Sequence, residues 1–139
     1  MVRVFMTPSE EQEQTAVVRW LRRNNVLFTH PPNGLIKSKV TGARAKRMGV
    51  SAGVPDLLIF TPPPRRAQAC GVAIEMKRRR GRRVVSLHQQ KWLRGLEEVG
   101  WLTYVVDGAS EGIRLLKELG YYIGEGSEGA RGPSISDAD

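Results

Sequence analysis

Residues 53–77 read GVPDLLIFTPPPRRAQACGVAIEMK and contain two short apolar runs, 57–60 and 72–74. Gly and Pro bound both runs, a pattern typical of β-strands. The intervening segment, Thr61 to Gly71, holds three consecutive prolines and cannot continue either strand. The sequence therefore predicts a two-stranded hairpin that carries acidic residues at its open end.

The alternation of side chains predicts which residues of this hairpin face each other. Antiparallel pairing from the open end places Asp56 opposite Glu75 and Leu57 opposite Ile74. Because successive side chains point to opposite faces of a sheet, Asp56, Glu75 and Lys77 then share one face. Two carboxylates and one ammonium group are expected to converge.

Such a trio has a recognisable chemistry. Adjacent carboxylates repel each other unless a cation lies between them. Hard oxygen ligands favour Mg²⁺, which retains several waters that a phosphate can displace. A lysine beside the ion can orient or deprotonate a bound water, whose pKa the metal lowers. The pattern indicates phosphodiester hydrolysis; the alternative is an exposed Asp beside a Glu–Lys pair on a solvated strand.

The same residues carry a resemblance to a known family. Pro55-Asp56 followed by Glu75-Met76-Lys77 resembles the PD-(D/E)xK nuclease motif. The flanking features are Gly49-Val50, Ser86-Leu87-His88-Gln89 with Trp92-Leu93, and Gly100 before a further strand. Together they resemble the VRR-NUC (virus-type replication-repair nuclease) family in its stand-alone form from phages and bacteria, over roughly residues 10 to 106.

This resemblance implies a restriction-endonuclease-like α/β fold and a metal-dependent DNA endonuclease. It implies that Asp56, Glu75 and the backbone carbonyl of Met76 bind Mg²⁺, for which Mn²⁺ can substitute, and that Lys77 positions or activates the attacking water. Stand-alone members resemble Holliday-junction resolvases, so we expect branched DNA as substrate and a homodimer with one site per subunit. The open alternatives are a nickase or less selective nuclease, a catalytically inactive nucleic-acid-binding module, and a scaffold that binds a protein partner.

The segment Thr7-Pro8-Ser9-Glu10 predicts the start of a helix that ends near Asn24. Thr7 would be its N-cap, and Glu10 would complete a capping box. Glu10 also shares a helical stripe with Val17, and the resemblance implies a catalytic contribution from an acid of this helix. The alternative is that Glu10 only caps the helix, and the neighbouring Glu11 and Glu13 leave the choice of acid open.

A second capping box is predicted where Ser86 precedes a helix and Gln89 occupies its third position. Gln89 also begins an apolar stripe that includes Trp92, which is expected in the core. The resemblance suggests that Gln89 supports the metal site or its water, whereas pure capping is the alternative. Ser110 is expected to cap a final helix that stops at Gly120.

Basic residues suit a polyanionic partner, and the formal net charge is +8. They can neutralise DNA phosphates without reading bases, or they can form a solvated charged face. Asn33, in a Pro-Pro-Asn-Gly turn, is a further candidate for DNA contact. The basic candidates are Lys37, Lys39, Arg44, Lys46, Arg47, Arg78, Arg79, Arg80, Arg82 and Arg83.

The 139 residues predict one domain over residues 1–123, with a disordered polar tail over 124–139. The expected architecture is a mixed sheet of about four strands flanked by helices, in the order αβ(α)ββαβα. There is no zinc-ligand spacing, no glycine-rich phosphate loop and no run long enough to span a membrane. We therefore expect no nucleotide cofactor and no membrane partner, with a cytoplasmic location in a bacterium or phage-infected host.

Overall fold

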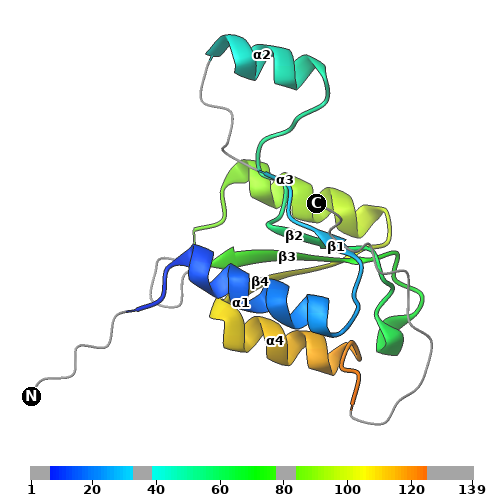
Figure 1. The fold of residues 1–139 in the computed structure, drawn as a ribbon. Helices are drawn as coiled ribbons and strands as arrows, with labels where there is room; N and C mark the ends of the chain where they lie inside the picture. The colour runs from blue at the N-terminus through cyan, green and yellow to red at the C-terminus, as the bar shows by residue number, and fades with distance from the viewer. Residues whose placement is uncertain (1–6, 33–38, 78–83, 125–139) are drawn as a thin grey trace, which may run out of the picture.

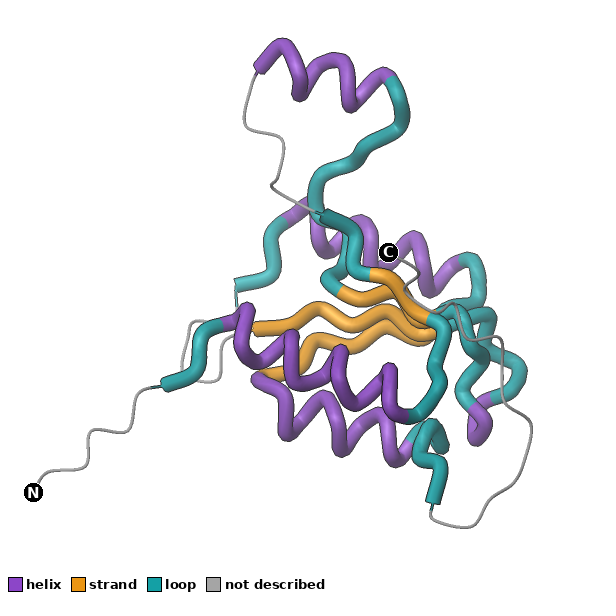
Figure 2. The backbone as a smooth tube through the Cα atoms, viewed as in Figure 1, coloured by secondary structure: helices purple, strands orange, loops and turns teal. Residues whose placement is uncertain are grey.

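The computed structural model describes residues 7–32, 39–77 and 84–124. Its strands form one four-stranded sheet in the order β1-β2-β3-β4 (Figure 2). The strands are β1 (Phe28–Thr29), β2 (Leu57–Ile59), β3 (Val72–Lys77) and β4 (Leu102–Asp107). The first three pair antiparallel, whereas β3 and β4 run parallel. The predicted mixed sheet is confirmed.

The helices form a layer on each face of this sheet. They are α1 (Glu10–Arg23), α2 (Lys39–Arg47), α3 (Leu87–Glu98) and α4 (Gly108–Glu118), with a short 3-10 turn at Pro64–Arg66. Figure 1 shows α1 and α4 side by side on one face, α3 on the other, and α2 standing apart beyond α3. The element order agrees with the predicted αβ(α)ββαβα.

The central hairpin has the predicted register. Leu57 pairs with Ile74, Leu58 with Ala73 and Ile59 with Val72. Asp56 therefore lies immediately before β2, beside the end of β3. The Gly and Pro residues that bound the two strands, together with the period-two alternation, were sufficient to predict this pairing.

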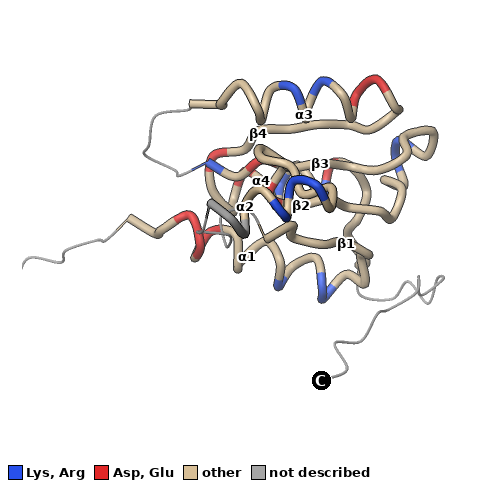
Figure 3. Tube along the Cα trace, turned by 90° about the horizontal axis from the view of Figure 1, so that it is seen from above, with Lys and Arg blue, Asp and Glu red and all other residues tan. Residues whose placement is uncertain are grey.

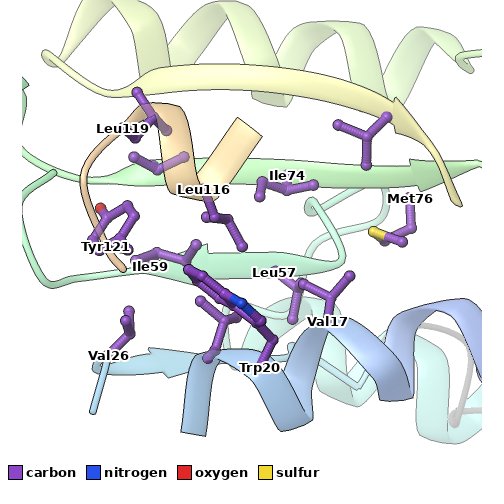
Figure 4. Close-up of a cluster of buried hydrophobic side chains, with 13 residues drawn as sticks. Val17, Trp20, Val26, Leu57, Ile59, Ile74, Met76, Leu116, Leu119 and Tyr121 are labelled. Carbon is purple, nitrogen blue, oxygen red and sulfur yellow. The ribbon is translucent and has the colours of Figure 1, made fainter. Parts of the chain in front are cut away.

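The core lies between the sheet and the α1–α4 layer (Figure 4). Val17 of α1, Leu116 of α4 and Ile74 of β3 are fully buried there. Burial of each such side chain contributes about 1.5–3 kcal/mol. Since Ile74 and Met76 point into this core, the alternate β3 residues emerge on the α3 face of the sheet.

Several local predictions are wrong. The capping box of α1 is formed by Ser9 and Gln12, not by Thr7 and Glu10, so α1 begins two residues later than expected. Both pairs fit the capping-box pattern, which leaves the choice to tertiary packing. In the same way α4 begins at Gly108, with Asp107 rather than Ser110 at the N-cap.

The prediction that Trp92 lies in the core is also wrong, because this side chain is half-buried and does not belong to the hydrophobic cluster. No residue of α3 is fully buried. The predicted tail beyond Gly124 lies outside the described residues. Among the helices that the structure describes, none is long and apolar enough to cross a bilayer.

Candidate active site

Asp56 is fixed at the mouth of the hairpin by backbone contacts on both sides. Its Oδ2 accepts a hydrogen bond of 2.7 Å from the backbone N–H of Met76. Its own carbonyl oxygen lies 2.6 Å from Nδ1 of His30, the residue that follows β1. The carboxylate is thus held against β3, beside Glu75, because the hairpin register brings the two positions together.

Glu75 is the most deeply buried acid of this site, with 4% of its surface exposed. Its Oε1 accepts a hydrogen bond of 2.8 Å from Nε2 of Gln89 and lies 3.4 Å from Nζ of Lys77. Its Oε2 is buried and has no hydrogen-bond partner within the described residues. A buried carboxylate oxygen without a donor is costly unless a cation or a proton compensates it.

This environment raises the pKa of Glu75 to about 7. Burial is the largest cause, because it penalises the charged form, and the nearby Asp56 carboxylate adds electrostatic repulsion. The Lys77 ammonium acts in the opposite direction and lowers the pKa. Without further positive charge, the pair of carboxylates therefore tends to retain a proton near neutral pH.

Gln89 joins the start of α3 to the site. Its Oε1 accepts from the backbone N–H of Ser86 at 2.9 Å, which closes the predicted capping box, and from Nζ of Lys77 at 3.2 Å. Its Nε2 donates to Glu75. Gln89 therefore both caps α3 and contacts the acidic site, so the two interpretations of this residue are compatible.

Gly53 sets how closely the loop before Asp56 approaches α3. Its φ of +82° lies in the left-handed region, where a side chain is strained. A Cβ at this position would lie 2.5 Å from the backbone carbon of His88 and 2.7 Å from the backbone nitrogen of Gln89. The absence of a side chain thus allows the Asp56 loop to contact the first turn of α3 directly.

The donor set fits a divalent cation such as Mg²⁺ or Mn²⁺. Within the described residues there is no cluster of three or more His, Cys, Asp or Glu side chains. Asp56 and Glu75 nevertheless supply hard oxygens, and Mg²⁺ is commonly held by one or two carboxylates plus waters. The uncompensated Oε2 of Glu75 and its raised pKa are both features that a bound cation would relieve.

The acid of α1 that faces inward is Glu13, so the prediction that Glu10 extends the buried stripe is wrong. Glu10 and Glu11 are exposed, whereas Glu13 is 7% exposed. The Glu13 carboxylate accepts a hydrogen bond from the backbone N–H of Ala109. It therefore supplies the first turn of α4 with the acceptor that the N-cap side chain of Asp107 does not provide.

The structure describes only some of the residues that were predicted to contact DNA. Arg44, Lys46 and Arg47 are exposed on α2, and Figure 3 shows basic residues along α2 and α3. Lys39 is the first residue of α2. Five predicted arginines and two loop positions lie outside the described residues: Asn33, Lys37, Arg78, Arg79, Arg80, Arg82 and Arg83.

His30 and Asp107 are two residues near the site that the sequence interpretation missed. His30 approaches Asp56 because β1 pairs with β2. Asp107 lies in register with Lys77 at the ends of the parallel strands β3 and β4. A signal existed for Asp107, since a polar residue at the carboxyl end of an apolar strand often lies at a functional edge of a sheet.

Comparison with known proteins agrees with this fold. The family model described as "VRR-NUC domain" matches residues 8–110. A solved structure titled "VRR_NUC domain protein" is 26% identical, covers 83% of this chain and 93% of its own, and superposes with a TM-score of 0.65. No curated protein matches the chain.

Proposed function

The chain belongs to the VRR-NUC family, whose fold is of the nuclease type, and from this membership we propose that it is a metal-dependent DNA endonuclease. One observation carries the proposal. Asp56, Glu75, Lys77 and Gln89 converge on the α3 face, where one oxygen of Glu75 is buried without a donor among the described residues. A DNA-binding module would need basic residues but not this costly arrangement of acids.

Asp56 and Glu75 would hold Mg²⁺ or Mn²⁺ together with the backbone carbonyl of Met76. The bound ion would supply Lewis-acid polarisation of the phosphate and a lowered pKa for the attacking water. The hydrogen bond from Met76 N–H to Asp56 keeps the aspartate beside this carbonyl-bearing residue. Glu75 must be deprotonated to serve as a ligand, which the positive charge of an ion favours.

We assign to Lys77 the role of positioning or activating the attacking water. Two of its three N–H donors are directed to Gln89 and Glu75, and the third can reach a water or a phosphate oxygen. The water attacks phosphorus as the bond to the 3′ oxygen breaks, which leaves a 5′-phosphate and a 3′-hydroxyl. Gln89 keeps the Lys77 ammonium in place, so we treat it as a positioning residue.

The exposed basic residues of α2 support a DNA substrate, since Arg44, Lys46 and Arg47 can neutralise phosphates on the side of the sheet that α3 covers. We propose branched DNA of the Holliday-junction type as the substrate. Two symmetric cuts in such a junction call for two sites, and hence for a homodimer.

The test is cleavage of labelled duplex, nicked, flap and four-way DNA, with and without Mg²⁺ or Mn²⁺. We expect metal-dependent cuts, paired in the four-way substrate. Asp56→Asn and Lys77→Ala should each lower the rate at least about 100-fold, because each removes a group that acts on the reacting atoms. Their DNA affinity should stay within a few-fold of wild type, since the basic residues remain.

Lys117→Ala and Glu118→Gln are matched controls, because both residues are exposed at the end of α4 and should leave the rate unchanged. Equal cleavage by wild type and Asp56→Asn would refute the assigned site. DNA binding without cleavage of any substrate would favour an inactive binding module. Metal-dependent but unpaired cuts would leave the nuclease chemistry standing and refute the junction-resolving activity.

A further inference from the structure

A groove of about 820 Å³ opens beside the candidate active site, between α2, the loop 49–53 and the first turns of α3. Its lining includes Gly53 and His88, which lie next to each other at the boundary with the site. Gln89, which holds Glu75 and Lys77, directly follows His88 on α3. A strand of DNA whose phosphate is cut at the site can therefore extend into this groove.

The lining combines basic and aromatic groups. Lys46 comes from α2, Lys91 and His88 from α3, and Trp92 forms the apolar part with Val50. No acidic side chain lines the groove within the described residues. Lysine and histidine side chains flanking an aromatic ring suit a polyanion that carries planar bases, because the cations contact phosphates and the ring stacks on a base.

The position of Trp92 on α3 explains why this side chain is available. His88, Lys91 and Trp92 occur at helical spacing on the groove side of α3, while Gln89 faces the carboxylates. Trp92 is half-buried and does not belong to the hydrophobic core. Its indole thus lines the groove and is not part of the packed core.

We propose that this groove binds an unpaired nucleotide of the DNA strand, with its base stacked on Trp92 and its phosphates contacted by Lys46 and Lys91. This inference rests on the proposed nuclease function and adds to its substrates branched DNA that carries an unpaired strand next to the cut, such as a flap; a fully paired four-way junction would be cut without using this subsite. A base inside a duplex is covered by its neighbours and offers no free face for stacking, so fully paired DNA cannot use this subsite.

The size of the groove agrees with this occupant. A volume of about 820 Å³ lies within the range of roughly 300–1,000 Å³ that ligand pockets occupy. It is adequate for a nucleotide or two and does not require a folded partner. The absence of acids from the lining, among the residues described, further favours a polyanion over a basic peptide.

The test compares binding of a short labelled oligothymidylate and a blunt hairpin duplex to the full chain in EDTA, by fluorescence anisotropy. We expect Trp92→Leu to weaken oligothymidylate binding about tenfold or more, since stacking contributes of that order per base, and duplex binding less than twofold. Trp92→Phe should restore most of the affinity, because the stacking face remains. Circular dichroism and thermal unfolding of each variant check that it folds.

Cleavage and assembly assays separate the other outcomes. With metal, Trp92→Leu should raise KM on flap DNA and leave kcat unchanged. Equal losses on both ligands, or no loss, in a wild type that cleaves DNA would overturn the groove assignment alone. A wild type that neither binds nor cleaves DNA would overturn the proposed function as well. Loss of a dimer in Trp92→Leu would show that a second copy of the chain occupies the groove, and would also overturn the assignment.

Discussion

Gln89 links the fold of α3 to the chemistry of the candidate site. A single side-chain oxygen accepts from the Ser86 backbone and from Lys77, and its amide nitrogen donates to Glu75. The same residue therefore satisfies an orphan donor at the helix start and fixes the distance between α3 and β3. A change at this position should affect stability and activity together.

For Gln89→Ala we predict a loss of about 1–2 kcal/mol in the free energy of unfolding, from the lost cap and the lost hydrogen bonds to charged groups. The cleavage rate should fall about tenfold or more, because Lys77 loses the acceptor that positions it. Urea unfolding and single-turnover cleavage measure the two effects. Gln68→Ala, at an exposed loop position, is the control; full activity in Gln89→Ala would rule out the positioning role.

The raised pKa of Glu75 predicts how stability depends on pH in metal-free protein. Its pKa is raised from 4.5 to about 7, so between these values the folded protein keeps a proton that the unfolded chain has released. The contribution of Glu75 to the free energy of unfolding is thus complete below about pH 4.5 and is lost as the pH rises through about 7.

Urea unfolding in EDTA at several pH values measures this dependence. Glu75→Gln mimics the protonated acid and should lack the decline between these pH values. The difference between wild type and Glu75→Gln isolates the effect from the other titrating groups. Parallel pH profiles for the two proteins would show that the folded state does not favour the protonated carboxyl.

Single residues also show where local sequence patterns do not predict which side chain is buried. Glu10 and Glu13 both lie in the helical stripe of Val17, and periodicity alone does not distinguish them. Glu13 is the buried one because the first turn of α4 lies opposite it. That contact joins residues 96 positions apart, so it follows from the packing of α1 on α4, which no local pattern encodes.

At the level of the elements, the hairpin and α3 are brought together at Gly53. The loop that leads to Asp56 approaches the backbone of His88 so closely that a Cβ has no room. Both contact partners are backbone atoms of a capped helix, which cannot move aside as a flexible side chain would. The loop that leads to Asp56 is therefore fixed against the first turn of α3.

Gly53→Ala tests this contact. Because it adds both strain at φ +82° and a clash with α3, we predict a destabilisation of about 2 kcal/mol or more and a fall in cleavage. Gly95→Ala is the matched control, since a Cβ there meets nothing within 4 Å; it should stabilise the chain by about 0.5–1 kcal/mol in mid-helix. The midpoints of urea unfolding measure both effects. Equal midpoints for Gly53→Ala and wild type would contradict the close contact between Gly53 and the backbone of α3.

The elements show which features sequence can predict. The hairpin register was predicted because Gly, Pro and period-two patterns act over short distances, and the Ser86–Gln89 cap because a capping box spans only four residues. The mixed sheet followed from the predicted order of the elements. Trp92 was assigned to the core because its stripe is apolar. The structure leaves it at a groove because α2 stands apart from α3, an arrangement that depends on the whole chain.

In the whole molecule, the division of the sheet into two faces explains how a small domain can maintain a costly acidic site. One face buries the apolar core against α1 and α4, and the other carries Asp56, Glu75 and Lys77 under a helix that has no fully buried residue. The residues that stabilise the fold and the residues of the candidate active site thus lie on opposite faces of the sheet. The electropositive character of α2 and the net charge of +8 add attraction for a polyanion.

Mn²⁺ binding, followed by electron paramagnetic resonance of the free ion at about pH 8, above the raised pKa of Glu75, tests most directly that the two carboxylates hold a metal. We predict that Asp56→Asn and Glu75→Gln each weaken binding at least about tenfold, since even outer-shell changes commonly cost that much. Glu118→Gln should bind as wild type does. Equal Mn²⁺ affinity in wild type and in both site variants would contradict the account.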